Sequence, residues 1–216
     1  MTQWVLYGDV FSVYTRTARM VLSIKSVPHR IEEIDPFDPD QTETVRALHP
    51  FVRVPILHVD EFELYETQAI LDYVEALCPD PRLCPADAQS AARMRQVMSL
   101  TDSYLYWPLV RQAAVQHVFN PLLGDPVDQG DLQAGLDAAP RVLDALEDLV
   151  AEGFVLVPGQ ATLADCHLWP MMDYALMVPE IAEMVGRRSA LAAWCEAMSE
   201  HPAAIATAPD LKALRI

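Results

Sequence analysis

The chain has 216 residues, 52% of them hydrophobic, so it can bury one large core or two smaller ones. Its 31 acidic and 15 basic residues give a net charge of −16, which argues against nucleic acid or an anionic membrane as partners, because both bind clustered Lys and Arg. No apolar run approaches the roughly 18 residues of a membrane span, and the first residues lack the pattern of a secretory signal, so we expect a cytoplasmic protein.

The chain has four cysteines and six histidines, and neither set has the spacing of a metal site. There is no C-x-x-C pair and no H-E-x-x-H. We therefore expect no metal, and we expect free, mostly buried thiols of the kind common inside cells. The cysteines are Cys78, Cys84, Cys166 and Cys195.

The first third of the chain alternates between strand-like and helix-like periodicity. The predicted order is β-α-β-α-β-β-α, with a hairpin turn at Asp60 and Glu61. That order is typical of a thioredoxin-like domain. The predicted strands are 4–7, 29–34, 56–59 and 62–65, and the predicted helices are 15–26, 41–48 and 67–77.

A segment with three prolines in seven residues follows and excludes both helix and central strand, so we read 79–87 as a linker between domain 1–78 and domain 88–216. Everything after it has helical periodicity. Predicted helices cover 87–119 with a kink at Pro108, 131–152, a segment opening at Thr162, and 189–199 as the last. Thr162 and Asp165 have the spacing of a capping box. The predicted fold is thus α/β followed by all-α.

The most informative stretch runs from His49 to Ile70. Pro55 stands where a strand begins, which is where a strand tolerates proline, and it is a candidate cis bond. Glu66 and Thr67 then open a helix, whose N-terminus attracts an anion while the Glu66 carboxylate can hold a cation. A strand edge, an anion site and a cation site together suit a small zwitterionic peptide bound in extended form.

This segment resembles the glutathione site of the cytosolic glutathione S-transferases, whose pattern is roughly Asn/His-Pro-x-Gly-Lys/Arg-Val-Pro followed later by Glu-Ser/Thr-x-Ala-Ile. Val52 stands at the usual glycine, where a β-branched residue would adopt a positive φ only at a cost. Thr67 replaces the commoner serine and keeps the hydroxyl. The capping box and the element order extend the resemblance over nearly the whole chain.

The resemblance assigns a role to each part of the peptide site. Val54, beside Pro55, would pair its backbone with the cysteinyl unit of glutathione. Glu66 would bind the γ-glutamyl ammonium and Thr67 the γ-glutamyl carboxylate. Arg53 would bind the glycyl carboxylate, although on sequence alone it is equally well read as a solvated surface charge.

Activation of the thiol is the central chemical requirement. Lowering a thiol pKa from about 8.5 by two units takes about 2.7 kcal/mol, which one hydrogen bond to a charged group can supply. Ser12 lies just before the first predicted helix, with Arg16 four residues on, and looks like the activating serine of theta-, phi-, tau- and zeta-like bacterial members. It also suits a plain helix cap. Tyr7, at the end of the first strand, is the rival; Tyr14 and Thr15 are weaker candidates.

Aromatic residues supply the expected electrophile pocket and a dimer contact. In some transferase classes an aromatic at the position of Phe51 enters the partner subunit of a homodimer; the alternative is that it folds onto its own domain. Core packing is the favoured reading for Trp107, which precedes Pro108. The pocket candidates are Phe11, Tyr14, Tyr104, Tyr106, Trp107 and Arg111.

The first functional reading is a serine-type glutathione S-transferase that conjugates the thiolate to a small hydrophobic electrophile in detoxification, with glutathione as co-substrate. The second is a non-catalytic binding or regulatory module on the same fold, because fold does not determine function. The third, a glutathione-dependent reductase or peroxidase, would need a protein thiol near residue 12, and the first cysteine is Cys78.

Overall fold

The computed structural model describes residues 2–214 and divides them into two compact units. The first unit runs to Leu83 and includes Ala206–Pro209, a segment from near the end of the chain. The second comprises Cys84–Ile205 and the residues from Asp210 onward. No helix among the described residues combines the length and apolar character needed to cross a bilayer.

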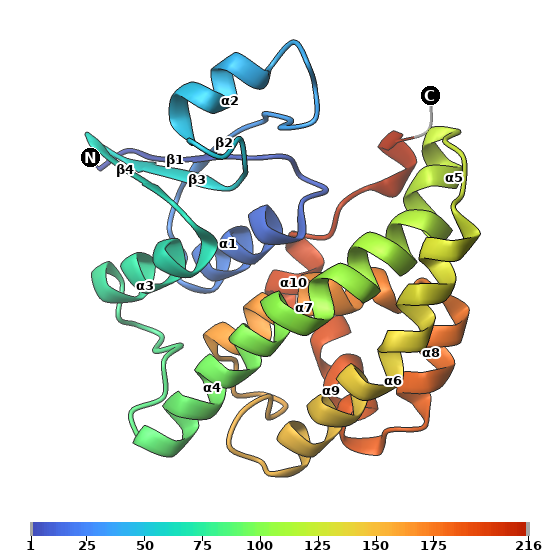
Figure 1. Cartoon of the computed structure of the whole chain (residues 1–216). Helices are drawn as coiled ribbons and strands as arrows, with labels where there is room; N and C mark the ends of the chain where they lie inside the picture. Colours follow the sequence, from blue (N-terminus) through green and yellow to red (C-terminus); the bar gives the residue numbers. More distant parts are fainter. Residues whose placement is uncertain (1, 215–216) are drawn as a thin grey trace. The chain divides into compact units, whose positions relative to one another are not determined.

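The first unit has the thioredoxin-like order predicted from the sequence (Figure 1). Its four strands stand in the order β2-β1-β3-β4; β2 is parallel to β1, and the other two pairings are antiparallel. The elements are β1 (Trp4–Tyr7), α1 (Val13–Ile24), β2 (Arg30–Glu32), α2 (Thr42–Leu48), β3 (Ile56–Val59), β4 (Phe62–Tyr65) and α3 (Thr67–Leu77).

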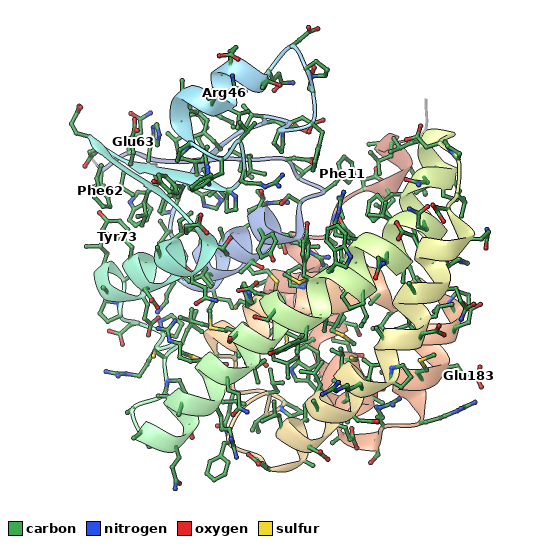
Figure 2. The ribbon with its side chains drawn as sticks, viewed as in Figure 1. Phe11, Arg46, Phe62, Glu63, Tyr73 and Glu183 are labelled. Carbon is green, nitrogen blue, oxygen red and sulfur yellow. The ribbon has the colours of Figure 1, made fainter. Side chains whose placement is uncertain are left out.

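The strand register explains how the two faces of this sheet are covered. Tyr7 pairs with Ile56, and both pack with Val45 of α2 in a core on one face. On the opposite face, Phe62 lies beside Tyr73 of α3, with ring centroids 5.0 Å apart (Figure 2). The sheet therefore lies between α2 on one side and α3 on the other, which fixes the loops at the strand ends.

The described elements of the second unit are helices, as predicted, apart from an isolated bridge between Val157 and Gln160 (Figure 1). Its capping box is confirmed: Asp165 accepts from Thr162 N at 2.8 Å, and Trp194 Nε1 donates to the same carboxyl at 2.8 Å. The elements are α4 (Ala88–Leu100), η1 (Thr101–Phe119), α5 (Asn120–Leu123), α6 (Gln129–Ala151), α7 (Leu163–Ala175), α8 (Pro179–Gly186), α9 (Ser189–Ser199), α10 (Pro202–Ala206) and η2 (Leu211–Leu214).

The helix predicted over 87–119 is confirmed as α4 and η1, and Pro108 lies inside the π-helical η1, whose wider turn accommodates it. Other details of the helical prediction were wrong. The helix at 189–199 is not the last, because α10 and η2 follow, and α8 was missed. Trp107 is 61% exposed in the single chain, so the core reading of its side chain is also wrong. None of the four cysteines forms a disulfide, as expected, but only Cys166 and Cys195 are buried, and Cys78 and Cys84 are half-buried.

Candidate active site

The turn between β1 and α1 places Ser12 at the N-cap of α1. Its backbone is extended, with φ −67° and ψ 123°, and its Oγ accepts a hydrogen bond from Thr15 N at 3.3 Å. The predicted N-cap role is therefore confirmed. A hydroxyl that accepts this bond keeps its own proton for donation, and the positive end of the α1 dipole lies beside it. Half-buried Ser12 can thus donate to an anion at the helix terminus.

The competing hydroxyls near this turn are less available. Tyr7 is half-buried, packs against the core formed with Ile56, and lies 4.6 Å from the ring of His58. Thr15 is fully buried, and its hydroxyl has no hydrogen-bond partner among the described residues. A Cβ added to Gly8 would lie 2.4 Å from Thr15 Oγ1, so this glycine allows the helix to approach the strand.

Asp9 gives the same turn an acidic character that the sequence reading missed. Burial raises the pKa of this carboxyl most, and the nearby carboxylates of Asp35 and Glu33 raise it further. The backbone N–H of Phe11 donates to Asp9 at 2.9 Å and acts in the opposite direction. Negative charge here opposes an anion, so a donor such as Ser12 must outweigh it.

The loop before β3 has the geometry expected for the peptide-binding edge. The Val54–Pro55 bond is cis, and β3 begins at the next residue, so both expectations for Pro55 are confirmed. Val54 is half-buried and Arg53 exposed. Arg53 is near enough to His49 to help lower the pKa of that imidazole.

Val52 adopts the conformation that the sequence comparison reserved for glycine. Its φ is +52°, in the left-handed region, which costs a residue with a Cβ about 1–2 kcal/mol. Its side chain packs against the core of Ile34, Val45 and Ile56, and this burial offsets part of the cost. The loop therefore keeps its positive-φ turn although a β-branched residue replaces the glycine.

The beginning of α3 brings together the two residues predicted to bind the γ-glutamyl group. Glu66 is the N-cap at φ 70° and ψ 116°, its side chain is 67% exposed, and it makes no capping hydrogen bond. Thr67 is buried. A non-glycine residue held at positive φ marks a position that the surrounding structure over-determines, and such positions cluster at ligand sites.

His49 is the residue of this region that the sequence reading left without a role. The side chain is 3% exposed, and its Nε2 lies 4.0 Å from Glu66 Oε1. Its Nδ1 accepts from Phe51 N at 3.1 Å, and its ring centroid is 4.5 Å from that of Tyr65. The only sequence signal was its place at the Asn/His position of the motif.

The remaining candidates divide between the two units. Phe11, labelled in Figure 2, and Tyr14 belong to the first unit and are half-buried. Phe51 is 71% exposed in the single chain, and its ring has an edge contact with the ring of His49 in its own unit, with centroids 6.0 Å apart. The other four candidates lie on η1 in the second unit: Tyr104 (67% exposed), half-buried Tyr106, Trp107 and half-buried Arg111.

Comparisons with known proteins show which sequences and folds this chain resembles. The family model for the glutathione S-transferase N-terminal domain matches residues 6–82. Glutathione S-transferase F14 of Arabidopsis thaliana is 29% identical over 74% of this chain and 65% of its own length, so the chain spans about two thirds of that relative. Glutathione S-transferase F13 of the same plant is 24% identical over 95% of each chain.

Solved structures extend the similarity to both units. Glutathione S-transferase III in its apo form has a TM-score of 0.81 and 28% identity, with 95% of each chain covered. Maleylacetoacetate isomerase from Anaeromyxobacter dehalogenans, with glutathione in its active site, has a TM-score of 0.76 and 26% identity over 97% of this chain and 96% of its own. Residues 6–82 therefore match the glutathione S-transferase N-terminal domain, and the chain as a whole is similar to glutathione S-transferases in sequence and fold.

Proposed function

We propose that this glutathione transferase uses Ser12 to stabilise the glutathione thiolate, which then attacks a small hydrophobic electrophile. The observation that carries the proposal is the cap of α1: Ser12 Oγ accepts from Thr15 N, leaving its proton for the sulfur. Tyr7, the rival, packs against the core beside Ile56. One charged hydrogen bond, at about 1.5–3 kcal/mol, is enough to bring a thiol pKa near neutrality.

In this proposal the rest of glutathione binds along the β3 edge and the start of α3. Arg53 takes the glycyl carboxylate, and Val54, beside Pro55, pairs with the cysteinyl backbone. Glu66 takes the γ-glutamyl ammonium, and Thr67, with the α3 terminus, takes the γ-glutamyl carboxylate. The exposed carboxylate of Glu66 and the exposed guanidinium of Arg53 give opposite charges at the two ends of the peptide.

The residues proposed to contact the electrophile are Phe11 and Tyr14 in the first unit and Tyr104, Tyr106, Trp107 and Arg111 in the second. Large aromatic side chains that remain exposed, as Tyr104 and Trp107 do, are typical of surfaces that bind apolar ligands. A cytoplasmic enzyme with such a site would detoxify reactive compounds. A panel of aryl halides, epoxides and enones at fixed glutathione concentration identifies the class accepted.

Ser12→Ala and Ser12→Gly test the proposal together. Both remove the hydroxyl, but glycine keeps most of the capping stability that alanine loses. We expect each variant to lose about 1.5–3 kcal/mol in kcat/KM, roughly 10- to 150-fold, with little change in glutathione Kd. The pKa of bound glutathione, followed by thiolate absorbance, should rise in both.

Ser12→Thr, which retains a hydroxyl, and Tyr7→Phe are the matched controls. An unchanged thiol pKa in both hydroxyl-free Ser12 variants, with a raised one in Tyr7→Phe, would transfer the role to Tyr7. Retention on immobilised glutathione without turnover of any electrophile would instead indicate a binding module.

Two of the four cysteines are poorly suited to a thiol-based reductase mechanism. Burial, with a smaller contribution from Asp173, raises the pKa of Cys195 to about 12, which keeps that thiol protonated. Cys166 is also buried. Only the thiolate attacks a disulfide or peroxide, so these two cysteines are chemically quiet. The sulfur that reacts in this proposal belongs to glutathione.

We also propose that the protein is a homodimer in which Phe51 enters the partner subunit. A phenyl ring 71% exposed on a single chain is an unusual feature of a monomer surface. In a symmetric dimer the contact occurs twice, so Phe51→Ala removes two anchors. We expect the variant to shift toward monomer at micromolar concentration in sedimentation velocity, with helix content unchanged. A variant that stays dimeric, or a monomeric wild type, contradicts this.

A further inference from the structure

His49 connects three parts of the first unit. It stands at the C-cap of α2, its ring contacts Tyr65 at the end of β4, and its Nε2 faces Glu66 at the start of α3. The side chain is nearly completely buried, which fixes the direction of both ring nitrogens. A buried imidazole held by three elements is a rigid support for the exposed carboxylate beside it.

The hydrogen bond at Nδ1 determines the tautomer. A backbone N–H can only donate, and Phe51 N donates to His49 Nδ1 at 3.1 Å, so Nδ1 carries the lone pair. The proton of a neutral ring is then on Nε2, the atom 4.0 Å from Glu66 Oε1. The N–H dipole therefore points toward the Glu66 carboxylate.

The charge state of His49 matters for a cation site. Burial lowers the pKa of this imidazole most and the Arg53 guanidinium lowers it further, while the Glu66 carboxylate raises it. The net direction is downward, so the ring is neutral at pH 7. A neutral N–H can orient Glu66 without cancelling the negative charge that an ammonium group would require.

We propose that His49 is a positioning residue for the γ-glutamyl ammonium: its Nε2–H, 4.0 Å from Glu66 Oε1, attracts that carboxylate through its dipole and favours the direction from which it binds that group. This inference rests on the proposed function, because it takes Glu66 as the ammonium ligand. Glu66 is 67% exposed and otherwise has several rotatable bonds, so orienting it before binding lowers the entropy cost of the complex. His49 itself does not touch glutathione.

Two substitutions separate the ring nitrogens. Asparagine places its amide oxygen near the position of Nδ1 and can still accept from Phe51 N, but it has no donor toward Glu66. Glutamine places its amide nitrogen near the position of Nε2 and can still donate to Glu66. We expect His49→Asn to raise the glutathione Kd about threefold, the low end of the range of a single hydrogen bond because the contact is 4.0 Å long, and His49→Gln to stay within about 1.5-fold of wild type.

A ligand control distinguishes positioning from general loss of structure. Each protein is titrated calorimetrically with glutathione and with its des-amino analogue, which lacks only the ammonium group. We expect the effect of His49→Asn to disappear with the analogue. Because the comparison uses two ligands on one protein preparation, partial unfolding of a variant does not imitate this result.

Equal losses for both ligands in His49→Asn, or a His49→Gln variant as weak as His49→Asn, would overturn the inference while leaving the proposed function intact. A wild type that binds the analogue as tightly as glutathione would overturn both, because the ammonium would then have no partner. The Ser12 experiments distinguish these cases, since they follow the thiol and not the ammonium.

Discussion

The N-termini of α7 and α3 differ in where their polar groups find partners. At α7, Asp165 accepts from Thr162 N, Thr162 Oγ1 and Trp194 Nε1, and the carboxyl is almost completely buried. At α3, Glu66 makes no capping bond and its carboxylate is largely exposed. The first terminus is satisfied within the protein, and the second leaves its charge and dipole for another molecule.

The contrast shows that a capping motif in a sequence does not by itself indicate stability or function. Each terminus has a carboxyl group that can accept hydrogen bonds or attract a cation. The buried carboxyl of Asp165 has partners within the protein, whereas the exposed carboxylate of Glu66 is available to a ligand. Burial raises the pKa of Asp165, and three hydrogen bonds offset this effect in part. Glu66 avoids this cost by remaining in solvent, and instead has a positive φ.

The largest expected effect concerns the N-terminus of α7, whose polar groups have partners within the protein. Asp165→Ala removes the N3 half of the capping box and leaves Trp194 Nε1 without its acceptor, so we expect the free energy of unfolding to fall by about 2–4 kcal/mol. Denaturation in urea measures it. Asp165→Asn, which keeps one acceptor oxygen, should lose less. A loss below about 0.5 kcal/mol in the alanine variant would remove the distinction between the two termini.

At the N-terminus of α3, substitutions should weaken glutathione binding. Glu66→Ala and Thr67→Ala should each raise the glutathione Kd roughly tenfold, or about 1.4 kcal/mol, since each removes a partner of a charged group. The unfolding free energy of Glu66→Ala should stay within about 0.5 kcal/mol of wild type, as is usual at exposed positions. Thr67→Ser is the control that keeps the hydroxyl. Wild-type affinity in both alanine variants would locate the ligand elsewhere.

The smallest effect is expected at Val52, whose backbone is constrained like that of Glu66 but whose side chain is packed. Val52→Gly relieves about 1–2 kcal/mol of backbone strain in the left-handed region. It also loses side-chain packing and raises the conformational entropy of the unfolded chain, so the free energy of unfolding should lie within about 1 kcal/mol of wild type. Val52→Ala loses packing and keeps the strain. The glycine variant should therefore be the more stable of the two in urea denaturation, and the reverse order would show that the turn is not strained.

The sequence predicted the first unit well because its boundaries are set by local chemistry. β1, the hairpin of β3 and β4, and α3 begin and end at the predicted residues. The helical unit was harder to predict. The short α8 depends on burial of Ile181 and Val185, which propensity alone does not reveal. The wider turn of η1 shifts the helical period, and with it the expected core position of Trp107.

Within the candidate site, the predicted residues are those whose chemistry appears in short motifs. Ser12 was recognisable because a serine before a helix suits both a cap and a thiolate donor. The relation of His49 to Glu66 was not, because it joins residues 17 positions apart through a contact that exists only in the folded unit. The charge around Asp9 is also assembled by folding, since Glu33 and Asp35 belong to a different segment.

The segment Ala206–Pro209 has a practical consequence for dissecting this protein. It belongs to the first compact unit, and the carbonyl of Thr207 accepts from Arg19 Nη1 at 3.3 Å. A fragment ending at Leu83 would lack Thr207 and with it the acceptor for Arg19 of α1. The same helix has Ser12 as its N-cap. No single cut of the chain separates the two units, so a truncated first unit is a poor surrogate for the intact protein in binding assays.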